Sequence, residues 1–112
     1  MAIRIKRVYE PASAEDGKRI LVDRLWPRGL SKDKAQVDLW LKEVGPSNAL
    51  RKWFGHDPER WSEFERRYRA ELKGSEALEE LKKAAKGNVT LLFGAKDEEH
   101  NQAIVLQSIL MR

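Results

Sequence analysis

One carboxylate and two guanidinium groups lie just after a short apolar run near the start of the chain. Residues 20–22 are typical of a strand buried on both faces, and Asp23, Arg24 and Arg28 follow them. Arginine pairs bidentately with phosphate or carboxylate, and a carboxylate beside such an anion can transfer a proton. We therefore predict an anion site in which Arg24 and Arg28 hold the ligand and Asp23 is a catalytic acid or base. The alternative is a closed salt bridge among these three residues that only fixes the turn.

Two further basic residues are candidates for the same anion. Arg51 lies on a short predicted helix, and Lys96 follows the last predicted strand, close to Asn101. The unpaired N–H groups of a helix that starts here would help Lys96 to bind phosphate. Two glutamates at the same place already occupy the positive end of that helix, so an ordinary capped helix start is an equal alternative. We expect Arg51 and Lys96 as anion contacts and Asn101 as a polar contact.

Ser47 and His56 have the side chains of a nucleophile and a base. Nothing in their spacing places them in contact. Ser47 also suits the N-cap of a short helix, and His56 lies at a turn before the next one. We therefore treat both as polar contacts and favour a structural role over a catalytic pair.

Trp26 differs from the other three tryptophans of the chain. Trp40, Trp53 and Trp61 fall on apolar faces of predicted helices, where core packing explains them. Trp26 lies in the charged turn, where it could stack on a ligand's base or sugar. It could equally close the end of the sheet, and both alternatives stay open.

The elements that position these residues predict an α/β fold. We expect a small, three-stranded and mostly parallel sheet, with strands near residues 2–8, 19–25 and 88–94. Four or five helices flank this sheet in a three-layer, single domain that spans residues 1–112. The link between the first two strands is short for a crossover, so an antiparallel first strand is an alternative. Ligands of such sheets bind beyond the carboxyl ends of the strands, where Asp23 lies.

Three of the expected helices make specific claims. The apolar spacing of residues 37–44 predicts one helix, which Gly45 ends. Asp57 caps a helix whose aromatic face packs against the sheet. Asp97 caps the last helix and places two glutamates in its first turn.

Composition excludes several classes of protein. The chain has no cysteine and only two histidines, so we expect no disulfide, no metal site and no cofactor. No apolar run approaches the roughly 20 residues of a membrane span, and a cytoplasmic location without membrane association is expected.

The net charge of +4 is unevenly placed. Residues 1–35 hold nine basic and five acidic side chains, whereas residues 36–112 hold thirteen of each. The surplus therefore lies in the part of the chain that contains Asp23. It favours an anionic partner, either a small molecule or nucleic acid, although a charge that only aids solubility fits equally well.

Several segments, spread over nearly the whole chain, carry a resemblance to one family. They are Lys6-Arg7-Val8-Tyr9, Asp16-Gly17, Leu21 to Gly29, Trp53-Phe54-Gly55-His56-Asp57-Pro58, and Ala95-Lys96-Asp97 with Asn101. This pattern resembles the YeaO-like family of small bacterial and archaeal proteins of unknown function. The resemblance implies a small cytosolic α/β domain with no established reaction.

Two classes of function follow from these residues. The first is the binding of a phosphate-bearing or other anionic small molecule, a nucleotide among them, by a protein that uses Asp23 for catalysis. The second is a nucleic-acid or nucleotide-binding module without catalysis. Salt separates the two, because contacts to a nucleic-acid backbone weaken log-linearly with salt concentration.

Overall fold

Four parallel strands form one sheet, in the order β1-β4-β2-β3, in a computed structural model that describes residues 2–111. The strands are β1 (Ala2–Arg7), β2 (Lys18–Leu21), β3 (Leu39–Trp40) and β4 (Asn88–Phe93). The α-helices are α1 (Lys32–Ala35), α2 (Asn48–Phe54), α3 (Trp61–Leu72), α4 (Glu76–Ala84) and α5 (Gln102–Leu110). Three short 3-10 helices add Ala14–Asp16, Lys42–Val44 and Pro58–Arg60. The predicted α/β class and the parallel sheet are confirmed.

The central strand β4 pairs in parallel with both β1 and β2. Five of its six residues are buried, as a strand covered on both faces requires. The first strand is therefore parallel, and the antiparallel alternative is wrong. This order brings the carboxyl ends of β2 and β4 together at one edge of the sheet.

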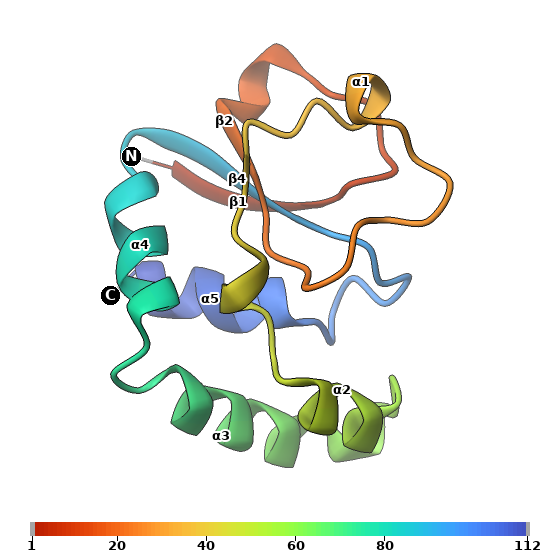
Figure 1. The fold of residues 1–112 in the computed structure, drawn as a ribbon, viewed down its shortest axis with the longest axis vertical. Helices are drawn as coiled ribbons and strands as arrows, with labels where there is room; N and C mark the ends of the chain where they lie inside the picture. Colours follow the sequence, from red (N-terminus) through yellow and green to blue (C-terminus); the bar gives the residue numbers. More distant parts are fainter. Residues whose placement is uncertain (1, 112) are drawn as a thin grey trace.

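The two faces of the sheet are covered differently. Helices α2, α3, α4 and α5 pack on one face and form the main core with Ile20, Leu91 and Phe93 (Figure 1). The other face carries a small cluster of Val8, Leu21, Ala35 and Leu92, over which α1 and the loops lie. One face is thus thick and helical, while the other is thin and made mostly of loops.

The helix predicted over residues 37–44 is wrong. Leu39 and Trp40 instead form β3, which pairs with Ile20 and Leu21 of β2, and a 3-10 helix follows. The side chain of Asp38 accepts a hydrogen bond from the N–H of Arg19 at 2.8 Å and holds the segment against β2. The helical spacing of the apolar residues does not predict the structure here, because the backbone N–H and C=O groups of the segment form hydrogen bonds with β2, which is distant in the sequence. This segment is the fourth strand that the sequence did not predict.

The aromatic core is confirmed. Phe64, Tyr68 and Leu72 of α3 are buried in the same cluster as Leu91 and Phe93 of β4. The Tyr68 hydroxyl donates to the carbonyl of Val44 at 2.5 Å, so its buried oxygen is satisfied. No helix within residues 2–111 has the length and apolar character that crossing a membrane requires.

Candidate functional site

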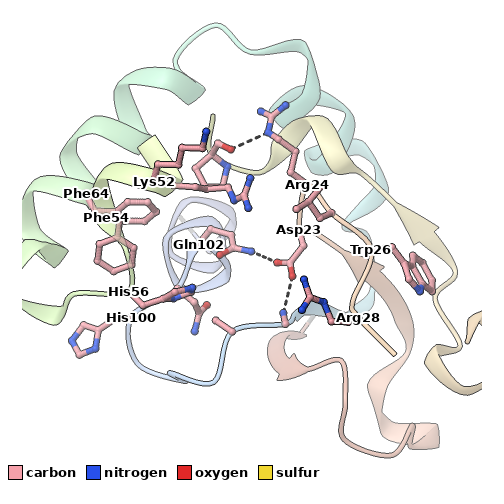
Figure 2. A pocket seen from close by; sticks show the side chains of 16 residues that line it. Asp23, Arg24, Trp26, Arg28, Lys52, Phe54, His56, Phe64, His100 and Gln102 are labelled. Atoms are coloured by element: carbon pink, nitrogen blue, oxygen red, sulfur yellow. Dashed lines mark hydrogen bonds between the residues drawn. The ribbon is translucent and has the colours of Figure 1, made fainter. Parts of the chain in front are cut away.

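A pocket of about 610 Å³ opens at the carboxyl ends of β2 and β4 (Figure 2). The predicted site residues that line it are Asp23, Arg24, Trp26, Arg28, Arg51, His56 and Asn101. The loop after β2, the helix α2 with its following turn, and the start of α5 supply them. The structure therefore brings together residues that are distant in the sequence.

Asp23 is held by neutral donors. Its Oδ2 accepts the backbone N–H of Gly94 at 2.8 Å, and its Oδ1 accepts the side-chain amide of Gln102 (Figure 2). A Cβ at position 94 would lie 2.9 Å from Oδ2, so only glycine allows this approach without displacement. Within residues 2–111 Asp23 makes no ion pair, and the closed salt bridge with Arg24 and Arg28 is not formed.

The surroundings of Asp23 disfavour its negative charge. Burial raises the pKa of Asp23 to about 6, from an ordinary value of 3.8. The hydrogen bonds from Gly94 and Gln102 oppose this rise, as does the positive charge of Arg51. A carboxyl group that titrates near pH 6 can exchange a proton under physiological conditions.

Arg24 points away from Asp23 to the chain that precedes α2 (Figure 2). Its Nε donates to the carbonyl of Pro46 at 2.9 Å, and one Nη donates to the carbonyl of Gly45 at 2.9 Å. Its other Nη lies 3.5 Å from a carboxylate oxygen of Glu43. Arg24 therefore joins the segment that follows β2 to the segment that precedes α2, where Pro46 lines the pocket.

The mouth of the pocket is cationic. Arg28, Arg51, Lys52 and His56 line it, and all four are exposed. Arg51 donates to the side chain of Asn48 at 2.7 Å, which restrains its guanidinium group. Asp23 is the one carboxylate among the lining residues, so arginine and lysine charges outnumber carboxylates at this site.

Lys96 and Ser47 do not line the pocket. Ser47 caps α2, accepting the N–H of Leu50 at 3.1 Å, and its hydroxyl donates to Glu71 at 2.6 Å. The predicted N-cap role of Ser47 is confirmed. Lys96 is exposed and lies outside α5, because that helix begins at Gln102.

The predicted cap of the last helix is wrong. Asn101 caps α5, and its side-chain oxygen accepts the N–H of Ile104 at 3.2 Å. Asp97 instead closes a turn by accepting the N–H groups of Glu99 and His100. The helix begins where buried apolar residues begin, and a buried Asn101 is a better anchor than an acidic, exposed stretch.

Trp26 lies at the side of the pocket, turned away from its centre (Figure 2). Its indole N–H donates to the carbonyl of Leu30 at 2.6 Å, and its ring meets the edge of Trp40 at 5.4 Å. The ring also packs on the small cluster of the thin face. These contacts support the alternative in which Trp26 closes the end of the sheet.

Sequence reasoning missed Gln102, Gly94 and Lys52, as well as His100 and the aromatic wall of Phe54 and Phe64. Gln102 follows the N-cap of α5 directly, so a correct helix start would have placed it near Asp23. Lys52 follows Arg51 on α2, and its place in the lining is visible only once the pocket is known. Among residues 2–111, no group of three or more metal-binding side chains is suited to a metal ion.

Comparison with known proteins identifies relatives along the whole chain. The family model described as "Inactive DUF488-N3 subclade" matches residues 2–112. The uncharacterised protein YeaO of Escherichia coli K12 is 46% identical over 110 residues, which cover 95% of this chain and 94% of YeaO. No solved structure matches the chain.

Mycobacterial proteins are similar to the chain to nearly the same degree. The uncharacterised protein Rv3073c of Mycobacterium tuberculosis H37Rv is 44% identical over 109 residues, which cover 96% of this chain and 92% of that protein. The uncharacterised protein Mb3100c of Mycobacterium bovis shows the same identity and coverage. The resemblance found in the sequence segments is thereby confirmed.

Proposed function

The chain belongs to the DUF488-N3i family of YeaO-like proteins, whose function is not established, and on that premise we propose that it binds a phosphate-bearing or other anionic small molecule. The site of binding is the pocket at the carboxyl ends of β2 and β4. In this proposal the protein binds its ligand without chemical turnover.

The charge balance of the pocket carries this proposal. Arg28, Arg51 and Lys52 are exposed at the mouth, with Arg24 behind them and a single carboxylate opposite. A concave site lined by one sign of charge raises the local concentration of oppositely charged ligands. A volume of about 610 Å³ also lies within the usual range for small-molecule sites, roughly 300–1,000 Å³.

Two observations bear on turnover. The description of the family as inactive supports binding alone. Proton transfer by Asp23 is the second candidate function, and it is favoured by a pKa of about 6 beside the cationic mouth. Release of phosphate from a bound phosphate ester, lost on Asp23→Asn, would support the second candidate over the first.

A nucleic-acid ligand remains the alternative to a small molecule. The concave shape and the carboxylate at its floor support the small molecule, because a carboxylate repels a phosphate backbone. Binding to short duplex DNA and RNA at increasing salt discriminates them. A steep log-linear loss of affinity would favour nucleic acid, with a slope that reports the number of phosphates contacted.

Thermal unfolding in the presence of simple anions tests the proposal. Inorganic phosphate, pyrophosphate and ribose 5-phosphate should raise the melting temperature in a concentration-dependent way at low salt. Arg28→Gln should reduce the rise, while Lys96→Gln removes the same charge outside the pocket and should leave the rise in place. The absence of any anion effect on the wild-type protein would contradict anion binding in this pocket.

A further inference from the structure

The pocket has exposed cations at its mouth and more buried polar side chains at its floor. The cations at the mouth, Arg28, Arg51 and Lys52, are exposed side chains. Asp23 and Gln102 at the floor are partly buried, and Asn101 beside them is only 2% exposed. Charged groups of a ligand are therefore best placed outside, and its uncharged polar groups inside.

The floor has acceptor positions left over. An ionised carboxylate can accept about four hydrogen bonds, and Asp23 receives one on each oxygen, from Gly94 and Gln102. The side-chain carbonyl of Gln102 accepts no hydrogen bond from the part of the chain that the structure describes. A ligand that fills this floor must therefore supply donors, and Asp23 can take two of them side by side.

Apolar and aromatic side chains form one wall between the mouth and the floor. Phe54 and Phe64 line the pocket with their rings stacked at 4.4 Å between centroids, and His56 lies beside Phe54 at 6.3 Å. Figure 2 shows these rings across the pocket from Asp23. Phe54 and Phe64 are only 5% and 2% exposed, so they give this side of the pocket an apolar boundary opposite the polar floor.

From this arrangement, and resting on the proposed binding of an anion, we infer that the ligand is a nucleotide whose base turns two adjacent N–H groups to Asp23, as guanine does. The phosphate then lies among the exposed cations at the mouth. Guanine presents two neighbouring donors on its pairing edge, whereas adenine and cytosine present a donor beside an acceptor. An acceptor facing an ionised Asp23 would leave two lone pairs opposed, which disfavours those bases.

Binding of matched phosphates to the wild-type protein tests this inference. Dissociation constants for GMP, IMP, AMP and ribose 5-phosphate are measured by calorimetry at pH 7.5, where Asp23 is ionised, and at low salt. GMP should bind at least about tenfold more tightly than AMP or ribose 5-phosphate, a step that a bidentate contact can supply. IMP keeps one of the two donors and should lie between GMP and AMP.

The variant Asp23→Asn sharpens the test. Asparagine keeps the size of the side chain but offers one acceptor in place of two, so the preference for GMP over AMP should fall below about threefold. Lys96→Gln, outside the pocket, is the matched control and should keep the preference. Circular dichroism and melting temperature establish that both variants are folded.

The outcomes separate this inference from the proposed function. If ribose 5-phosphate and GMP bind equally well, anion binding stands and the inference about the base is wrong. If a folded Asp23→Asn variant keeps the full preference for GMP, the contact with Asp23 is wrong. If none of the four phosphates binds, both the anion site and its base specificity are contradicted. If the Asp23→Asn variant does not fold, the order of affinities of the four phosphates for the wild-type protein still tests the inference about the base.

Discussion

Asp16 and Asp23 stand in similar sequence contexts but in opposite environments. Each precedes an arginine closely in the chain, Arg19 in one case and Arg24 in the other. Asp16 lies on the thin face of the sheet, where its Oδ2 is 2.5 Å from Arg19 and 3.2 Å from Lys6. Asp23 lies at the end of the sheet and meets only the neutral donors of Gly94 and Gln102.

The pKa values of the two carboxyl groups reflect this difference. Burial raises the pKa of Asp16, but the N–H of Ser13 and the side chains of Lys6 and Arg19 outweigh it, so the pKa lies below 3.8. Burial of Asp23 is not compensated in this way, and its pKa rises to about 6. A closed ion pair of the kind considered as the alternative at Asp23 is thus present at Asp16, whereas the carboxylate of Asp23 makes no ion pair within residues 2–111.

The largest expected effect on stability comes from removing the ion pair between Arg19 and Asp16. Arg19 also donates to the carbonyls of Ala35 and Gln36, so Arg19→Ala leaves Asp16 buried without its strongest partner and two carbonyls without donors. The free energy of unfolding should fall by about 3–5 kcal/mol. Urea unfolding at pH 7 measures it, with the exposed Arg66→Ala as the control. A loss below about 1 kcal/mol would show that the network is not structural.

The second prediction concerns the dependence of stability on pH. The folded state raises the pKa of Asp23 and so binds its proton more tightly than the unfolded chain does. The contribution of Asp23 to stability is therefore greatest below pH 4, falls as pH rises from about 4 to 6, and is level above. At about 1.4 kcal/mol per pKa unit, the fall is about 2–3 kcal/mol.

Asp23→Asn removes this titration and should be more stable than the wild-type protein above pH 6. The measurement is the difference in unfolding free energy between the two proteins from pH 3.5 to 7.5, in which the other acids cancel. Asp16→Asn gives the contrasting profile, because a lowered pKa contributes stability that is lost as pH falls through the acid range. If the difference in unfolding free energy from the wild-type protein changed with pH in the same direction for both variants, the contrast between Asp16 and Asp23 would be contradicted.

A smaller effect is expected at Gly94. Gly94→Ala places a Cβ 2.9 Å from the Oδ2 of Asp23 and displaces that carboxylate. The free energy of unfolding should fall by about 1–3 kcal/mol, and weakening of the Gly94 hydrogen bond should raise the pKa of Asp23 further. Carboxyl NMR titration measures the pKa. The double variant Gly94→Ala with Asp23→Ala removes the close contact between the added Cβ and the carboxylate. If its loss of unfolding free energy equals the sum of the losses in the two single variants, the contact does not explain the effect of Gly94→Ala.

The smallest effect on stability is expected for Arg28→Lys. Arg28 is exposed, and its side chain makes no ion pair with the rest of residues 2–111, so stability should change by less than about 0.5 kcal/mol. Binding of phosphate should still weaken severalfold, because lysine lacks the planar fork of arginine. Calorimetry and urea unfolding on the same preparations measure both quantities. Unchanged phosphate affinity would remove Arg28 from the site.

The sequence predicts the parts of the fold that depend on local signals. Ser31, Ser47 and Ser75 cap α-helices as their residue types indicate. Asp57 caps the 3-10 helix Pro58–Arg60, which leads directly into α3, whereas the N-cap of α3 itself is Arg60, so the predicted cap is correct only for the start of this helical segment. It does not predict β3, because that strand has two residues and is defined only by its pairing with β2.

The same distinction applies to the site. The step from an apolar strand to charge locates Asp23 and its edge of the sheet, and parallel pairing brings α5 to that edge. The partners of Arg24 and Asp23 are backbone groups and an amide from distant segments, which no local pattern reveals. Residue types alone therefore left an anion site and a closed salt bridge as alternatives, and the packing does not form the salt bridge.

The position of β4 between β1 and β2 has a consequence for synthesis. The two early strands leave the ribosome long before the strand that must join them, and the parallel sheet has no other way to pair them. Until residues 88–93 emerge, β1 and β2 expose unpaired backbone edges and apolar side chains. The nascent chain is therefore expected to need protection by a holding chaperone, and a ribosome stalled before β4 should display a segment that proteases cut readily.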